Sequence, residues 1–156
     1  GIIVADELSV GELKVNTYRY FKEAEKDNLQ LFETVQSLNT SHPTNFFAPI
    51  HGTVTQPFSA QDQQYGIIVT SYGNKNASAV LKGTIIHMQY DINSNYTIVV
   101  QHTQFTSIYS GLQKPLKKVG DHVAAGEVIG LIQDQTLGFE LWKNGAAINP
   151  EEFIVF

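Results

Sequence analysis

The strongest constraint on the fold is a series of short segments with β-strand composition, which begins near Phe46 and continues to the end of the chain. These segments are rich in Val, Ile, Thr and aromatic residues, which favour pleated and half-buried backbone. Turn-forming stretches such as DINSN and KNGA separate them. Short strands at this spacing are typical of a sandwich or barrel, so we expect a mainly β, antiparallel domain over residues 46–156. The segments are GTVTQPF, YGIIVTSY, GTIIHMQY, YTIVVQH, FTSIYSGL, EVIGLI and GFELW.

The first 45 residues differ in composition from the rest. Residues 12–40 contain neither Gly nor Pro, and their apolar residues recur at the spacing of one helical face. Pro43 and its polar neighbours then end the helical pattern. We therefore predict a helical segment and linker over residues 1–45, ahead of the β domain. The apolar stripe consists of Phe21, Ala24, Leu31, Val35 and Leu38, with Asn28 on the same face.

Charge and cysteine content exclude several classes of protein. The chain has fifteen acidic and ten basic residues, a net charge of −5, and no basic stripe, so we expect no nucleic-acid partner. No apolar run approaches the roughly 18–20 residues of a membrane span. Because the chain begins with Gly1, we expect membrane attachment only through an anchor upstream of this fragment. The absence of cysteine excludes thiolate zinc sites, disulfides and thiol nucleophiles.

Six stretches, in order, resemble the LytM or lysostaphin-like zinc endopeptidases, which cut peptide cross-links in bacterial cell walls. The resemblance covers about residues 47–156 and implies the fold of that family, an antiparallel β-sandwich of the duplicated-hybrid-motif type. Its most specific parts are LKKVGDHVAAGEVIG and TLGFELWKNGAAINPEEFI. The other four stretches are FFAPIHGTVTQPF, QYGIIV, VLKGTII and YTIVVQHTQFTSIYSGL.

The departures from the family pattern fall on its catalytic positions. Active members need a zinc ion with three protein ligands and an open position for water. The resemblance assigns the three ligand positions to Gln64, Ile68 and Gly138, and it assigns two assisting histidine positions to Gly111 and Thr136. Four of these five residues can neither bind metal nor do proton chemistry. We therefore predict no zinc, no other cofactor, no catalytic residue and no enzymatic activity.

The histidines of the chain offer little basis for a rebuilt site. None shows the His-x-His or His-x₃-His spacing that would place two imidazoles on one metal ion. His102 ends a strand close in sequence to the altered positions, so it is the best candidate for a residual polar role. The five histidines are His42, His51, His87, His102 and His122.

A scaffold without catalytic residues keeps its groove, and we predict that this groove is a binding surface. Aromatic residues close to it in sequence are candidate contacts, with core packing as the alternative. For Tyr109 the core is the favoured alternative, whereas for Trp142 the two are balanced. The predicted groove residues are Gln64, Tyr65, Ile68, His102, Tyr109, Gly111, Thr136, Gly138 and Trp142.

The resemblance also implies a setting, because catalytically degenerate LytM-type domains occur in bacterial envelopes, where some activate cell-wall amidases. The leading hypothesis is a non-enzymatic domain, on the periplasmic or extracellular side of the envelope, that binds and regulates an amidase, another hydrolase or an envelope protein. One alternative is a module that binds peptidoglycan without cutting it, and a weaker one is a hydrolase with a rebuilt site. A local cluster of Lys114, Lys117 and Lys118 is either solvated or a contact for acidic wall peptide.

Overall fold

The computed structural model describes residues 45–93 and 95–156 of the chain. The predicted helical segment over residues 12–40, and its boundary with the β domain, lie outside these described residues. Within them, no helix has the length and hydropathy needed to span a membrane.

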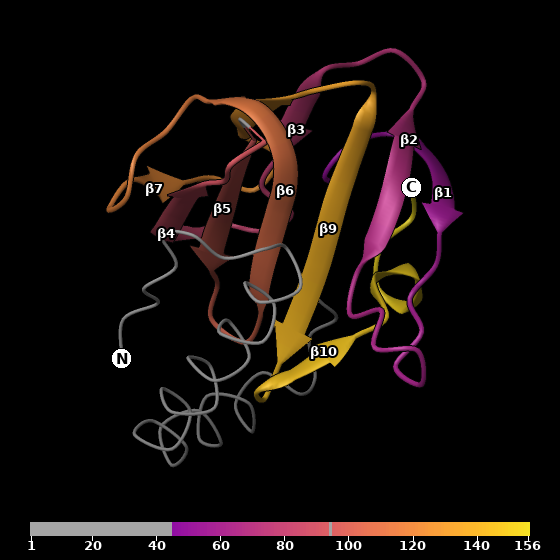
Figure 1. The fold of residues 1–156 in the computed structure, drawn as a ribbon. Coiled ribbons are helices and arrows are strands. Elements are labelled where there is room, and N and C mark those ends of the chain that lie inside the picture. Colours follow the sequence, from indigo (N-terminus) through magenta and orange to yellow (C-terminus); the bar gives the residue numbers. More distant parts are fainter. Residues whose placement is uncertain (1–44, 94) are drawn as a thin grey trace.

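The described residues form ten strands and one short 3₁₀ helix (Figure 1). The strands are β1 (Gly52–Gln56), β2 (Ile67–Ser71), β3 (Asn76–Ser78), β4 (Gly83–Tyr90), β5 (Tyr96–Gln101), β6 (Thr106–Pro115), β7 (His122–Val123), β8 (Val128–Ile132), β9 (Thr136–Lys143) and β10 (Ala146–Ile148), followed by η1 (Pro150–Glu152).

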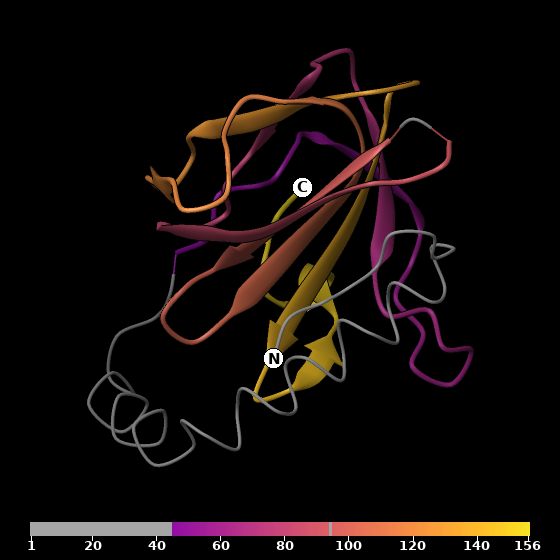
Figure 2. The ribbon, with the colours of Figure 1, turned by 60° about the vertical axis from the view of Figure 1, so that its left-hand side comes forward.

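All ten strands belong to one antiparallel hydrogen-bonded sheet that curls into two layers. The larger layer has the order β1-β2-β9-β6-β5-β4-β7, and β10 pairs with β9. The long strand β6 pairs with β5 and β9, and its last residues, Leu112 to Pro115, pair with β8. Since β8 also pairs with β3, strand β6 carries the chain from the larger layer into the smaller one (Figures 1 and 2). The predicted mainly β, antiparallel fold is confirmed.

Five of the seven predicted strand segments contain one of the longer strands, and the other two overlap with β6 and β9, which extend beyond them. The turn-forming stretch DINSN, Asp91–Asn95, connects β4 and β5. The Asp91 N–H donates to the Asn95 carbonyl at 2.9 Å, and the Asp91 carboxylate accepts from the Asn93 and Asn95 N–H groups. The sequence did not indicate β3, β7 and β10, which have only two or three residues each. A strand that short is too brief for an alternating pattern to be recognised.

The hydrophobic core lies between the two layers. Strand β9 shows how the sequence builds it, because Leu137, Phe139 and Leu141 alternate with residues that point the other way. They meet Ile67 and Val69 of β2, and all five residues are at most 1% exposed. Fully burying a side chain of this size stabilises the fold by about 1.5–3 kcal/mol. This packing fixes the register of the larger layer, since a shift by one residue would turn these side chains to the opposite face.

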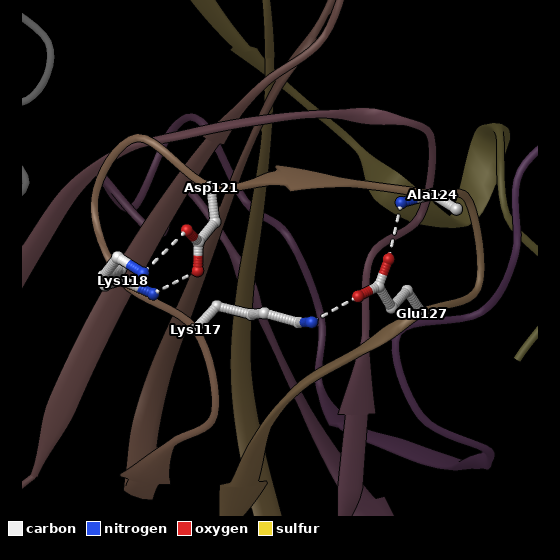
Figure 3. Close-up of polar contacts among 5 residues, drawn as sticks. All are labelled: Lys117, Lys118, Asp121, Ala124 and Glu127. Atoms are coloured by element: carbon white, nitrogen blue, oxygen red, sulfur yellow. Dashed lines mark hydrogen bonds and ion pairs between the residues drawn. The ribbon is translucent and has the colours of Figure 1, made fainter.

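Two carboxylates order the turns on either side of β7 (Figure 3). Asp121 accepts the Lys118 N–H at 2.9 Å, and Glu127 accepts the Ala124 N–H at 2.9 Å. These backbone hydrogen bonds are the first cause that lowers the pKa of both carboxyl groups. Lys117 and Lys118 form ion pairs with Glu127 and Asp121, respectively. Two of the three lysines in the predicted cluster are therefore compensated by nearby acidic groups.

Candidate functional site

The candidate site lies on the outer face of the larger layer, which we define as the side of β4, β5, β6, β9 and β2 turned away from the core. On β9, Thr136, Gly138, Glu140 and Trp142 point to this face, because they alternate with the three core residues of that strand. On β2, Ile68 and Thr70 point to the same face, between the core residues Ile67 and Val69. The outer face therefore carries the residues of β9 and β2 that alternate with the core residues.

The sheet register brings the three predicted ligand positions together. Ile68 lies directly opposite Gly138, and Gly138 lies directly opposite Ser110 on β6. Gln64 precedes β2, and its side-chain carbonyl accepts from the Gln56 amide at 3.1 Å. Since Gln56 is paired with Ile68, Gln64 lies beside the same row of residues. Positions 64, 68 and 138 are thus neighbours in the fold.

The two remaining predicted positions lie one row further along the same strands. Thr136 is paired with Thr70 across β2 and β9. Gly111 follows Ser110 with a φ of +76°, and a Cβ atom built on it would lie 3.9 Å from the Thr136 carbonyl oxygen. All five altered positions therefore gather on one part of the outer face, over β2, β9 and the middle of β6. We call this part the polar patch.

The side chains of the polar patch do not fit a zinc ion. Zinc takes thiolate, imidazole or carboxylate ligands, and the patch offers only hydroxyl groups and the Gln64 amide. That amide is already engaged, with its oxygen bound to Gln56 and its nitrogen donating to the Gly66 carbonyl at 3.1 Å. Among the described residues, no three His, Cys, Asp or Glu side chains come together as a metal site.

The space beside Gly138 is also occupied. A Cβ atom at this position would lie 2.2 Å from the Ser110 hydroxyl oxygen, closer than real Cβ contacts allow. A histidine could stand there only if the Ser110 side chain moved. The local packing of β6 against β9 is therefore adapted to a residue without a side chain.

Next to the polar patch lies an apolar patch on the same face. We define it as Val99 of β5, Ile108 of β6 and Trp142 of β9, with Tyr65, Ile86 and Ala147 packed around them. The Trp142 indole N–H donates to the Glu140 carboxylate at 3.0 Å, and the Tyr65 ring centroid lies 6.3 Å from that of Trp142. Glu140, which is buried, thus fixes the orientation of the indole. Two predicted groove residues, Tyr65 and Trp142, belong to this patch.

The structure places the other two predicted groove residues, His102 and Tyr109, away from both patches. Tyr109 has no exposed surface and belongs to the core cluster, because the alternation along β6 turns it inward while Ile108 and Ser110 point outward. His102 is only 6% exposed and reaches Ser107, which shares the inward face with Tyr109. Both side chains therefore lie on the opposite side of the sheet from the polar patch.

His102 and Tyr109 belong to a buried chain of hydrogen bonds. His102 Nδ1 lies 2.8 Å from the Lys82 carbonyl oxygen, which can only accept, so Nδ1 carries the ring proton. His102 Nε2 lies 2.8 Å from the Ser107 hydroxyl, which is 3.1 Å from the Tyr109 hydroxyl. The Tyr109 hydroxyl accepts the Val80 N–H at 3.0 Å. These contacts join the start of β4 to β5 and β6.

Burial sets the charge state of this chain. It lowers the pKa of His102, against a smaller opposite effect of the Lys82 hydrogen bond, and it raises the pKa of Tyr109. Both groups are therefore neutral near pH 7. The close Ser107–His102 pair resembles a nucleophile with its base, but Ser107 has no exposed surface for a substrate to reach. The arrangement holds strands together and offers no site for hydrolysis.

The family follows from comparison with known proteins. The model of the family described as "Peptidase family M23" matches residues 62–150, which is more than half of the chain and includes the polar patch. The chain belongs to peptidase family M23. This confirms the resemblance to LytM and lysostaphin-like peptidases that the sequence motifs indicated. No curated protein matches the chain.

Solved structures share the M23 fold at low sequence identity. Csd3 of Helicobacter pylori has a TM-score of 0.64 and 19% identity, covering 73% of this chain and 36% of its own. A chain from the complex of SpoIIIAH and SpoIIQ has a TM-score of 0.60 and 23% identity, covering 70% of this chain and 100% of its own. Lysostaphin has a TM-score of 0.53 and 22% identity, covering 70% and 50%. This chain thus spans about a third of the length of Csd3.

Sequence reasoning missed the hydroxyl groups that line the polar patch. The motifs did not indicate Ser110, Thr70 or Thr55 as site residues. The Thr55 and Thr70 hydroxyl oxygens lie 3.1 Å apart, across β1 and β2. The signal for Ser110 and Thr70 was present, because both alternate with core residues in FTSIYSGL and GIIVTSY. What the pattern could not supply was the register that places these strands side by side.

Proposed function

We propose that this M23 domain is a non-enzymatic component of the bacterial cell envelope that binds and regulates a cell-wall hydrolase, most simply an amidase. The observation that carries the proposal is the polar patch. It gathers the five positions that the family resemblance assigns to zinc binding and catalysis, and their residues fit neither role. The patch keeps small and hydroxyl-bearing side chains on an open sheet face, where backbone and hydroxyl groups are suited to bind a protein segment.

Two further points support a binding role over a catalytic one. The five residues of the polar patch include no acidic or basic side chain, so a partner would meet no buried charge from them. The chain is also similar to a chain from the complex of SpoIIIAH and SpoIIQ, in which a protein of this fold is found with another protein. A sequence identity of 23% supports a shared fold and does not identify the partner of this chain.

The test is a binding measurement with a charge introduced into the polar patch. Thr136→Arg places a long cation beside Gly138, and we expect it to weaken capture of a purified cell-wall amidase at least tenfold, or about 1.4 kcal/mol. Thr103→Arg makes the same exchange on an exposed loop residue and should leave capture unchanged. Equal capture by both variants and the parent would remove the polar patch from the interaction.

A separate binding measurement tests the alternative that the domain binds peptidoglycan. Purified wall sacculi without any protein partner should not retain the parent chain if the proposal holds. Retention that Thr136→Arg abolishes and Thr103→Arg preserves would favour a wall-binding module instead. Release of soluble wall fragments, measured in the same tubes, would contradict both binding proposals.

A further inference from the structure

The outer face continues beyond the polar patch, onto the edge of the sheet. Val54 of β1 packs against the core, so Thr53 and Thr55 on either side of it point to the outer face. The Thr55 hydroxyl oxygen lies 3.1 Å from that of Thr70, and Thr70 is paired with Thr136 of the polar patch. Hydroxyl groups therefore extend from β9 across β2 to β1, the outermost strand of the larger layer (Figure 1).

One aromatic side chain stands on this part of the outer face. Tyr72 directly follows β2, and its side chain lies with the outward-facing Thr53, because the Tyr72 hydroxyl accepts from the Thr53 hydroxyl at 3.3 Å. With 76% of its surface exposed, Tyr72 is the most exposed aromatic residue in the part of the chain that the structure describes. We call the surface formed by Thr53, Thr55, Thr70, Tyr72 and Thr136 the hydroxyl surface.

The backbone holds Tyr72 in place without a partner. Its N–H donates to the His51 carbonyl at 3.3 Å, and the N–H of the preceding Ser71 donates to the Gln135 carbonyl at 2.8 Å. The Ser71 hydroxyl also accepts the Gly73 N–H at 3.1 Å. An exposed tyrosine on fixed backbone loses little conformational freedom when it binds. Tyrosine is one of the three residue types that most often dominate the free energy of binding at protein interfaces.

The five side chains of the hydroxyl surface carry no charge. In residues 45–74, which include β1, β2 and the loop between them, Asp62 is the only Asp, Glu, Lys or Arg. The next charged residues along these strands, Lys75 and Asp134, lie in turns beyond the strand ends. A charged group of a partner would lose water on this surface without meeting an opposite charge, which disfavours its binding. The surface therefore favours an uncharged segment.

The spacing of the hydroxyl groups matches an extended chain. Alternate residues of a strand, such as Thr53 and Thr55, repeat at about 6.8 Å. The backbone carbonyl and N–H groups on one side of an extended segment repeat at the same distance, so neighbouring hydroxyl groups can bond to successive backbone groups. A helical segment uses these backbone groups internally and offers none along its length.

We propose that the hydrolase partner binds the hydroxyl surface through an extended, uncharged segment, with Tyr72 as the main aromatic contact. This inference rests on the proposed function. It adds to that function the part of the outer face that is bound, the chemistry of the partner segment and the residue on which affinity depends most. The contact begins at the polar patch and ends at the edge strand β1.

The test measures the dissociation constant of a purified cell-wall amidase for the full chain and its variants. Tyr72→Ala removes the ring, so we expect affinity to fall at least about tenfold, whereas Tyr72→Phe keeps the ring and should stay within about threefold of the parent. Tyr90→Ala is the matched control, because it removes a 53% exposed ring that lies against Tyr96 on the core side of the sheet. This control should keep the parental affinity.

Two further measurements test the chemistry of the bound segment. Thr53→Val keeps the shape of the side chain and removes its hydroxyl group, so affinity should fall about threefold or more. Thr103→Val makes the same exchange on an exposed loop residue and should leave affinity unchanged. Because the contact is uncharged, the dissociation constant of the parent should change less than about threefold between about 50 and 500 mM NaCl.

The negative results separate this inference from the proposed function. No capture of the amidase by the parent would overturn both. Capture that Tyr72→Ala and Thr53→Val leave intact, or that weakens more than about tenfold over this salt range, would overturn the hydroxyl surface and leave the proposed function standing. Thr53→Val decides the matter if the urea midpoint of Tyr72→Ala falls below that of the parent.

Discussion

The side chains of β6 show how single residues divide the two faces of the sheet. Ile108 and Ser110 point outward to the apolar and polar patches, whereas Ser107 and Tyr109 point inward and link β4, β5 and β6 through buried hydrogen bonds. The sequence indicated this alternation but not which face was the core. For Tyr109 the core was the favoured alternative to the groove, and the packed structure shows that its ring meets Phe139 at 5.3 Å.

Replacing Tyr109 by Phe should measure how much its hydroxyl group contributes to the free energy of unfolding. The ring keeps its packing, but the buried Val80 N–H loses the acceptor that now lies at 3.0 Å. We expect the free energy of unfolding to fall by about 1–3 kcal/mol, the cost of leaving a buried donor unsatisfied. Urea denaturation of the two proteins measures it. Tyr72→Phe, on a 76% exposed side chain, should change the same quantity by less than about 0.5 kcal/mol.

The stability of the domain should depend on pH through His102. Its pKa in the folded protein lies below the ordinary value of 6.5, so the unfolded chain binds a proton first as pH falls. The associated stability is fully present above pH 6.5 and is lost progressively as pH falls from there toward the folded pKa. Urea denaturation between about pH 7 and pH 5 should show this slope. His102→Gln should reduce this slope to the part that His87 contributes, because burial lowers the pKa of His87 as well. The exposed-site variant His51→Gln should keep the parental slope.

Strand β6 is the element on which the architecture depends. It contributes to both layers, and it changes partners from β9 to β8 around Gly111. This residue has a φ of +76°, a conformation that favours glycine. The family resemblance implies a histidine at this position in active members, so the bend falls on one of the five predicted site positions. The longer strands were predictable because each has enough residues to show alternation, but the bend was not, since nothing in YSGL distinguishes a turn from a bulge.

Replacing Gly111 by Ala should isolate the conformational cost of this bend. The added Cβ would meet only the Thr136 carbonyl oxygen, at an ordinary 3.9 Å, so no steric clash contributes. Holding a residue with a Cβ in the left-handed region costs about 1–2 kcal/mol, and we expect that loss in the free energy of unfolding. Ser110→Ala, one residue earlier, should cost less than about 0.5 kcal/mol in the same urea titration. A cost as small as that control for Gly111→Ala would mean that the bend relaxes freely.

For the molecule as a whole, the sequence predicted the family and the fold because six motifs occur in order over the β domain. It also predicted five altered positions that the sheet register brings together on one face. Two things were beyond its reach. Cross-strand register depends on packing between segments far apart in sequence, and strands of only two or three residues are too short to show an alternating pattern.

Zinc content tests most directly whether this M23 domain lacks a zinc site. The chain should be purified with zinc present and measured by elemental analysis, with lysostaphin prepared in parallel as the control that retains metal. Because Gln64, Ile68 and Gly138 supply no imidazole, thiolate or carboxylate, we expect zinc well below one equivalent per chain. One equivalent of zinc that survives dialysis would contradict the account and would indicate a rebuilt metal site in an active hydrolase.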